Sequence, residues 1–254
     1  MLRWITTRPQ PDGSTSALPC FIWLPGWSFM PEVFLPWIKQ LPGEHWGLDW
    51  QRQPPQQQAA EQEFAQLVAK LLAHPVAQRA THWIGWSLGG WVGEGVFAQG
   101  GLAPQAQLIT LGSTLDFAAP ELDLAAFQTQ FAAHPQRSLA YFARLCCQGA
   151  PQALHQRQQL IRTQLTGQTE QEQAQLALGL AWLAKIETSQ WNQPAEPIQR
   201  WVAATGSDRL CRQPFADAQI STSTSHVFFL DPAWIQASTQ QCHITGASRI
   251  TPCS

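Results

Sequence analysis

The stretch Ala80-Thr-His-Trp-Ile-Gly-Trp-Ser-Leu-Gly-Gly90 decides the fold. Its apolar run predicts a strand that ends at Gly85-Trp86-Ser87-Leu88-Gly89, and a helix is predicted from Leu88 to about Gln99. Glycines on both sides of a serine let the strand and helix approach closely and hold the serine Oγ clear of the backbone. The helix N-terminus supplies main-chain N–H groups and a positive potential that suit an oxyanion. We therefore predict that Ser87 is a nucleophile.

Length and charge narrow the classes of protein that the chain can represent. Its 254 residues fit one large α/β domain, or one such domain with an insertion. The net charge of −2 argues against a nucleic-acid or membrane-surface partner. No apolar run approaches the ~18 residues of a membrane span, and the first residues lack the apolar stretch of a signal peptide. We therefore expect a cytoplasmic protein.

The cysteines do not predict a metal site or a disulfide framework. They show no C-x-x-C spacing and no histidine at ligand spacing. We expect reduced, mostly buried thiols and no metal ion. The 13 tryptophans are expected mostly in the core or in the lining of a pocket. The six cysteines are Cys20, Cys146, Cys147, Cys211, Cys242 and Cys253.

The order of predicted elements is typical of a parallel sheet covered by helices, interrupted once by a helical insertion. Strands are expected at Leu2–Thr7, Cys20–Leu24, His45–Trp50, Gln107–Leu111 and Trp201–Thr205, and helices at Val33–Leu41 and around Phe64–Leu72. Four further helices are expected at Leu122–Ala133, Arg137–Cys147, Gln152–Leu165 and Glu170–Ile186. We predict a core formed by residues 1–120 and 188–254 and a lid formed by residues 121–187.

A serine nucleophile needs a base, and the base needs an acid that orients it. On this topology the acid follows the serine and the histidine comes last. Asp208 follows a predicted strand, and His226 lies on a loop before a final helix that begins near Pro232. We therefore predict the set Ser87, Asp208 and His226. The alternatives are Asp217 and Asp231 for the acid and His243 for the base.

The remaining histidines are not expected to be catalytic. His82, on the strand before Ser87, is expected to be a satisfied core residue. Surface or loop positions are expected for His45, His74, His134 and His155.

Two main-chain N–H groups are expected to bind the oxyanion of a reacting ester. One belongs to Leu88, directly after the nucleophile, and the other to Trp27 in the loop after an early strand. Pro25 stands where many hydrolases have histidine. Because the donor is a main-chain N–H, that histidine is dispensable.

Five segments resemble the pimeloyl-acyl-carrier-protein methyl ester esterases of biotin synthesis. They are WLPGW at 23–27, WIGWSLGGWV at 83–92, YFARLCCQG at 141–149, TGSD at 205–208 and SHVFFLDPA at 225–233. The resemblance runs from about Phe21 to Ile235 and implies an α/β-hydrolase fold with a four-helix lid. Two features differ from that family: the short interval between Asp208 and His226, and the tail 238–254, which does not read as an amphipathic helix.

The resemblance implies the same three catalytic residues and no cofactor. It also implies that Trp27, Leu88, His226 and the lid segment Phe142–Cys146 contact the substrate. Helical spacing places Leu139, Phe142 and Cys146 on one face of a lid helix, which we expect over the acyl chain.

The partner implied by this resemblance is an acyl carrier protein that bears a pimeloyl methyl ester. The stretch from His134 to Gln168 contains four arginines and neither aspartate nor glutamate, so we expect it to dock the acidic carrier. These arginines are Arg137, Arg144, Arg157 and Arg162. The protein is expected to be a monomer. The alternatives are a broad-specificity small-ester carboxylesterase without a carrier and a non-catalytic binding module of the same fold.

Overall fold

The fold is built on one mostly parallel sheet. The computed structural model describes residues 1–9, 18–50, 55–56, 58–114, 122–150, 152–186, 198–202, 208, 210, 215, 217–221 and 225–241. Seven strands are ordered β1-β3-β2-β4-β5-β6-β7, and β1 alone runs antiparallel to its neighbour, β3. Their bounds are β1 (Leu2–Arg8), β2 (Cys20–Leu24), β3 (Gly43–Leu48), β4 (His82–Trp86), β5 (Gln107–Leu111), β6 (Ile198–Val202) and β7 (Gln219–Ile220).

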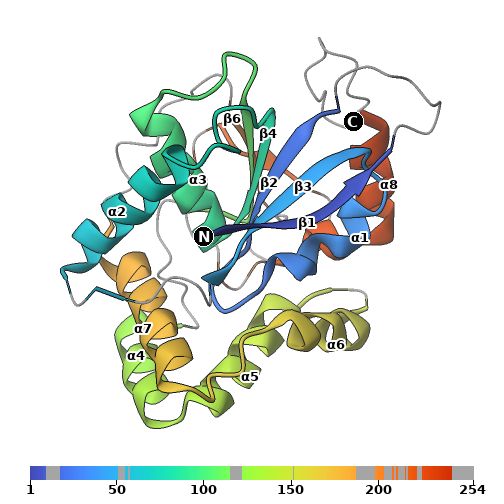
Figure 1. The fold of residues 1–254 in the computed structure, drawn as a ribbon. Coiled ribbons are helices and arrows are strands. Elements are labelled where there is room, and N and C mark those ends of the chain that lie inside the picture. The colour runs from blue at the N-terminus through green and yellow to red at the C-terminus, as the bar shows by residue number, and fades with distance from the viewer. Residues whose placement is uncertain are drawn as a thin grey trace.

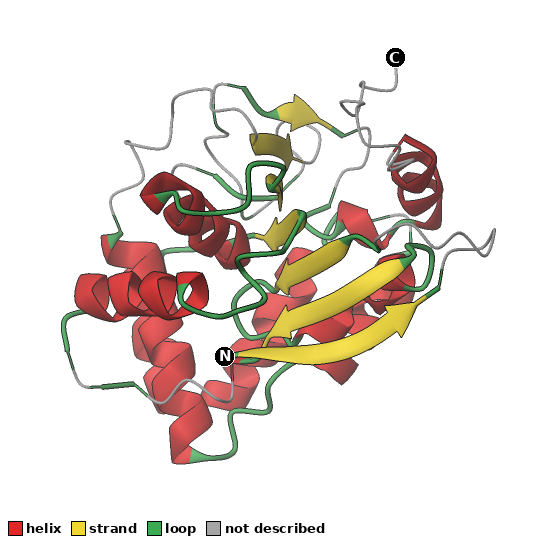
Figure 2. Cartoon of the chain, turned by 45° about the horizontal axis from the view of Figure 1, so that its top comes forward, coloured by secondary structure: helices red, strands yellow, loops and turns green. Residues whose placement is uncertain are grey.

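Helices cover both faces of this sheet (Figure 1). The helices α2 (Ala60–Leu72) and α3 (Leu88–Gln99) lie on one side, and α1 (Leu35–Ile38) and α8 (Pro232–Gln241) lie on the other. In the turned view of Figure 2 the strands likewise lie between helices. Every residue of β2 is buried, as expected for a parallel strand covered on both faces.

The lid consists of the helices between β5 and β6, and it lies across the carboxyl ends of the parallel strands (Figure 1). Its helices are α4 (Leu124–Ala133), α5 (Pro135–Cys146), α6 (Ala153–Thr163) and α7 (Glu170–Lys185). Local chemistry sets their starts: the Asp123 side chain accepts the Ala126 N–H at 3.0 Å, and Thr169 accepts the Glu172 N–H at 3.1 Å. Each boundary lies within two residues of the sequence prediction.

Three predicted elements need correction. The helix expected at Val33–Leu41 is a 3₁₀ turn, η1 (Pro31–Phe34), followed by the short α1, because Pro36 has no N–H to donate to the preceding turn. The strand predicted at Trp201–Thr205 is β6, which begins three residues earlier, at Ile198, and pairs with β5 over Leu108–Leu111. The tail 238–254 begins inside α8, which continues to Gln241; residues 242–254 lie outside the described part.

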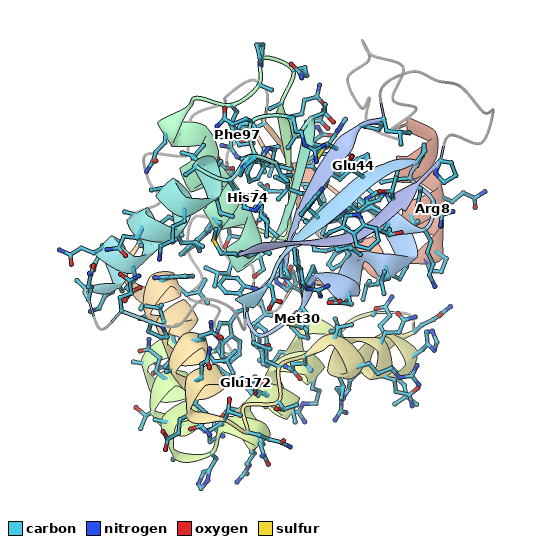
Figure 3. The ribbon with its side chains drawn as sticks, in the orientation of Figure 1. Arg8, Met30, Glu44, His74, Phe97 and Glu172 are labelled. Atoms are coloured by element: carbon cyan, nitrogen blue, oxygen red, sulfur yellow. The ribbon has the colours of Figure 1, made fainter. Side chains whose placement is uncertain are left out.

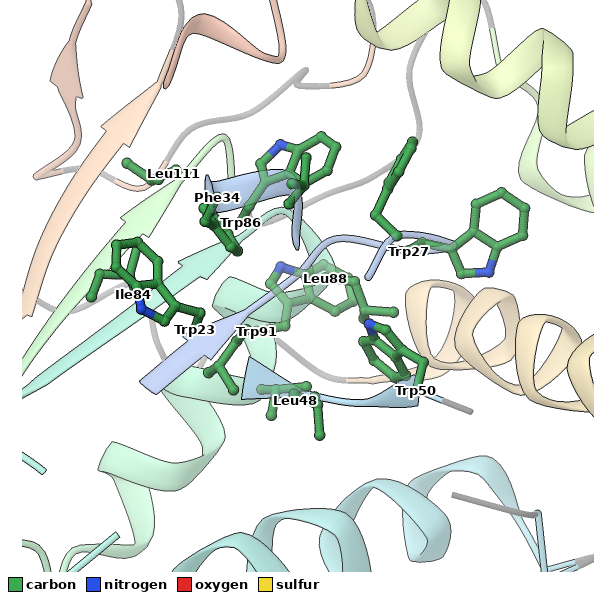
Figure 4. Packing of buried hydrophobic residues seen from close by; sticks show 14 of the residues in the cluster. Trp23, Trp27, Phe34, Leu48, Trp50, Ile84, Trp86, Leu88, Trp91 and Leu111 are labelled. Carbon is green, nitrogen blue, oxygen red and sulfur yellow. The ribbon is translucent and has the colours of Figure 1, made fainter. Parts of the chain in front are cut away.

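The core between sheet and helices is rich in tryptophan, as expected. Trp23, Trp83, Trp86 and Trp91 are among its buried members, whereas Trp4 on the edge strand is exposed. Figure 4 shows several of these rings packed around the ends of β2 and β4. Cys20, Cys146 and Cys147 are buried free thiols, in line with the prediction; the other three cysteines lie outside the described residues.

The prediction that His45 is a surface or loop residue is wrong. Its side chain is fully buried: Nδ1 accepts the indole N–H of Trp23 at 3.1 Å, and Nε2 lies 3.1 Å from the Leu41 carbonyl oxygen. Burial lowers the pKa of His45 to about 4, the Leu41 hydrogen bond opposes that shift, and the charge of Arg8 adds slightly to it. His45 is therefore a neutral core histidine.

Candidate active site

Ser87 occupies the sharp turn between β4 and α3. Its backbone angles, φ 54° and ψ −119°, are unusual for a residue with a side chain. The turn is held by hydrogen bonds from Ser87 N to the Leu111 carbonyl (2.8 Å) and from Ser113 Oγ to the Ser87 carbonyl (2.9 Å). A Cβ at Gly89 would overlap the Leu24 carbonyl oxygen, so glycine is required for α3 to pass this close to β2.

The Ser87 hydroxyl is buried, and its Oγ has no hydrogen-bond partner among the described residues. An unpartnered buried hydroxyl and a strained turn both cost free energy, and such features are concentrated at functional sites. The strand, sharp turn and helix that the glycines around Ser87 predict are therefore observed.

Asp208 and His226 form a buried pair. The distance from His226 Nδ1 to Asp208 Oδ2 is 2.9 Å, and the other carboxylate oxygen of Asp208 accepts the Leu210 N–H at 2.8 Å. Nδ1 therefore carries the proton that is donated to the carboxylate, which assigns the lone pair of the neutral ring to Nε2. This is the tautomer that a general base requires.

His226 lies beside the turn that carries Ser87. The indole N–H of Trp86, the residue before Ser87, donates to the His226 carbonyl at 3.1 Å, and the two ring centroids are 5.6 Å apart. A Cβ placed on Gly112, just after the end of β5, would lie 3.1 Å from His226 Cε1. The structure thus pairs Asp208 with His226 beside the turn that carries Ser87, and Ser87 Oγ makes no hydrogen bond to the His226 ring. The sequence prediction missed the role of Trp86, whose indole N–H holds the backbone of His226.

The alternative acids have other partners. Both oxygens of Asp217 lie 2.7 Å from Nη1 of the buried Arg200, whose guanidinium also pairs with Glu94 of α3. Asp231 accepts the Ala233 N–H at 2.9 Å at the start of α8. The rival base, His243, lies outside the described residues.

Trp27 and Leu88, the predicted oxyanion donors, lie in the loop after β2 and at the start of α3. Leu88 is the first residue of α3, so its N–H has no acceptor within the helix. Trp27 follows the end of β2, and a Cβ on Gly26 would touch the Trp86 ring at 3.0 Å. Among the described residues, the main-chain N–H of Trp27 has no hydrogen-bond acceptor. Neither of these two N–H groups therefore has a hydrogen-bond acceptor in the part of the chain that the structure describes.

The predicted acyl-contacting residues of α5 all face inward. Leu139, Phe142 and Cys146 are buried, and the Phe142 ring meets the Trp27 ring edge-on with centroids 4.8 Å apart. Burial raises the pKa of the Cys146 thiol well above its ordinary value, and the charges of Cys147 and Asp208 raise it further. This face of α5 therefore packs on the loop that carries Trp27, and Cys146 lies close enough to Asp208 for the two side chains to interact electrostatically.

The four lid arginines differ in exposure. Arg137, Arg144 and Arg162 are exposed, and the Arg144 guanidinium lies 5.1 Å from the Tyr141 ring centroid. Arg157 is half-buried, and its charge opposes the burial-induced rise in the pKa of Cys147. Three of the four arginines that were predicted to dock the carrier are therefore exposed, whereas Arg157 lies on the side of α6 that turns toward Cys147.

The described residues contain neither a cluster of metal-ligating side chains nor a membrane-spanning helix. No group of three or more His, Cys, Asp or Glu side chains there is placed to hold a metal ion. Within the same part of the chain, no helix has the length and apolarity needed to cross a membrane.

Comparison with solved structures identifies the fold as that of the α/β-hydrolases. A lipase-esterase related protein from Clostridium acetobutylicum superposes with a TM-score of 0.65 at 15% identity, covering 94% of this chain and 97% of that one. The esterase EaEST from Exiguobacterium antarcticum superposes with a TM-score of 0.63 at 14% identity, covering 94% of this chain and 92% of that one. The enol-lactonase from Burkholderia xenovorans gives 0.61 at 13% identity, covering 94% of each. No protein-family model and no curated protein sequence matches the chain.

Proposed function

We propose that this protein is a serine carboxylesterase that hydrolyses the methyl ester of a pimeloyl group carried on acyl carrier protein. The observation that carries the hydrolase part is the buried pair of Asp208 and His226 beside the strained turn at Ser87. The fold neighbours that are named esterases and an enol-lactonase support the same chemical class. No cofactor is needed for this reaction.

In the proposed reaction Ser87 Oγ attacks the ester carbonyl while His226 Nε2 takes the hydroxyl proton. Asp208 holds the imidazole through Nδ1 and stabilises the imidazolium that forms. The N–H groups of Trp27 and Leu88 bind the oxyanion of the tetrahedral intermediate. His226 then returns the proton to the departing methoxide, and methanol leaves an acyl-Ser87 intermediate. Water activated by the same imidazole hydrolyses it to a free carboxylate.

The substrate part of the proposal rests on two other features. The five sequence segments resemble the pimeloyl-carrier esterases, and the lid carries a basic, acid-free surface. Between Asp123 and Glu170 the chain has no acidic residue, and Arg137 and Arg144 project from the side of α5 opposite the buried Phe142. One lid helix would thus offer an apolar side to the acyl chain and a basic side to an acidic carrier protein.

The test compares a carrier-bound pimeloyl methyl ester with the free dimethyl ester and with p-nitrophenyl esters. Mass spectrometry follows conversion of methyl ester to acid on the carrier. The proposal predicts a higher kcat/KM for the carrier-bound ester, and that advantage should fall as salt screens charges over ~8 Å. Equal kcat/KM values and parallel salt curves would favour the broad-specificity esterase. Absence of turnover with every ester would favour the non-catalytic module.

A further inference from the structure

Two strained serines flank the proposed oxyanion site. Among the described residues, Ser28 (φ 69°) and Ser87 (φ 54°) are the non-glycine residues with positive φ. Ser87 is the proposed nucleophile, and Ser28 directly follows Trp27, the proposed oxyanion donor. A side-chain-bearing residue stays in the left-handed region only where its surroundings hold it there. The positive φ of Ser28 belongs to a turn in which the Phe29 N–H donates to the Gly26 carbonyl at 3.2 Å. That carbonyl and the Trp27 N–H are in one peptide unit, so the contacts that hold Ser28 bear on the direction of the Trp27 N–H.

Those contacts come from the lid. The connection between α6 and α7 runs antiparallel to residues 28–30 and forms a β-bridge between Phe29 and Gln164. Leu165 N donates to the Ser28 carbonyl at 2.8 Å, and Met30 N donates to the Thr163 carbonyl at 2.7 Å. Figure 3 labels Met30 where the end of the sheet meets the lid helices. The loop that carries the oxyanion donor is thus hydrogen-bonded to the lid on both sides of Phe29.

The Gln164 side chain completes this connection. Its amide nitrogen lies 3.1 Å from Ser28 Oγ and 3.1 Å from the Leu139 carbonyl oxygen in α5. An amide NH₂ has two protons, so both contacts can be satisfied at once. Gln164 therefore ties α5, the helix that faces the proposed acyl site, to the strained residue of the oxyanion loop. Sequence reasoning missed it because 136 residues separate Gln164 from Ser28.

The Trp27 side chain is also held by the lid (Figure 4). Its indole N–H donates to the Leu176 carbonyl of α7 at 2.8 Å. A Cβ on Gly179 would lie 2.7 Å from Trp27 Cδ1, so the ring packs directly on the α7 backbone. The Phe142 ring of α5 also contacts the Trp27 ring edge-on. A change in lid position would thus act on both the side chain of Trp27 and the residue that follows it.

We infer that Gln164 and Ser28 are positioning residues that couple the lid to the oxyanion hole. With the lid in this position, Gln164 and the main-chain bonds of residues 163–165 hold the left-handed turn at Ser28 and so aim the Trp27 N–H at the oxyanion. The inference rests on the proposed serine-ester chemistry and goes beyond it. It makes transition-state stabilisation depend on the lid rather than on the sheet and α3 alone.

A double-mutant cycle tests this coupling. Gln164→Met keeps the side-chain length but removes the amide, and it should lower kcat on p-nitrophenyl butyrate about 10-fold with KM nearly unchanged, less than the loss of a whole oxyanion donor. Ser28→Gly removes the same side-chain hydrogen bond from its other end and frees the backbone, so it should lower kcat by a similar factor. In the Ser28→Gly background, Gln164→Met should cost no more than about twofold. Equal losses in both backgrounds would overturn the inference.

A second measurement does not depend on turnover, so it separates this inference from the proposed function. The ¹⁵N–¹H resonance of the Trp27 main-chain amide should shift on Gln164→Met in the wild-type background and stay in place in the Ser28→Gly background. Gln159→Met, which removes a lid glutamine that contacts His155, is the control for a general lid effect. An unmoved Trp27 resonance, or the same shift with Gln159→Met, would refute the coupling even if no ester were hydrolysed.

Discussion

Acidification should destabilise this protein through two histidines at the amino ends of the parallel strands. Burial lowers the pKa of His45 and of His82 to about 4 each, against 6.5 for the free side chain. Because the folded pKa is depressed, the unfolded chain binds more protons between pH 6.5 and pH 4, and the free energy of unfolding falls as the pH drops through that window. At pH 5 the loss relative to pH 7.5 is about 2 kcal/mol for each histidine.

Urea unfolding between pH 7.5 and pH 5 measures this loss. His45→Gln retains a donor and an acceptor for Leu41 and Trp23 but cannot titrate, so its pH-dependent loss should be about 2 kcal/mol smaller than that of the wild type. His82→Gln should give a similar reduction. The exposed His134, replaced by glutamine, is the matched control and should reproduce the wild-type slope. A His45→Gln curve parallel to the wild type would refute the reasoning.

Three further predictions concern the site. Asp208→Asn should lower kcat by about 10⁴ by favouring the wrong imidazole tautomer, and Asp217→Asn should do much less, both measured by steady-state kinetics. Phe142→Ala should cost about 3–5 kcal/mol of stability in urea unfolding and raise KM more for long acyl esters than for acetate. Charge reversal at Arg137 and Arg144 together should lower kcat/KM about tenfold on the carrier-bound ester at low salt, without changing that on p-nitrophenyl acetate.

Each of these predictions has a distinct contrary result. A more damaging Asp217→Asn would transfer the acid role away from Asp208. If Phe142→Ala changed KM equally for acetate and long esters, the inward face of α5 would be ordinary lid packing. Equal loss on both substrates after reversal of Arg137 and Arg144 would remove the carrier from the proposal.

The sequence was sufficient where the signal was local. The turn at Ser87 is encoded by adjacent glycines between an apolar strand and a helix, and the observed elbow follows that pattern. The juxtaposition of Asp208 and His226 was predictable because chain order and strand ends constrain where an acid and a base can lie. The lid helices could be predicted in the same way, since their helix-forming composition and the capping residues Asp123 and Thr169 are local to each segment.

The sequence did not predict the features that depend on contacts between distant segments. His45 was predicted to be a surface or loop residue. In the structure Phe21 of the neighbouring strand β2 stacks on its ring with centroids 4.9 Å apart, and the Trp23 indole N–H donates to its Nδ1. The left-handed backbone of Ser28 carries no residue-type signal, because glycine would be the usual choice there. Its hydrogen bond to Gln164 spans 136 residues, so no local pattern could reveal it.

The most direct test of the central claim is covalent labelling of the nucleophile. A fluorophosphonate should add one phosphonyl group to the intact protein, and peptide mass spectrometry should place it on Ser87. Ser87→Ala should remain folded, resist the reagent and lose several orders of magnitude in kcat on p-nitrophenyl butyrate. Labelling at another residue, or an active Ser87→Ala protein, would contradict the account.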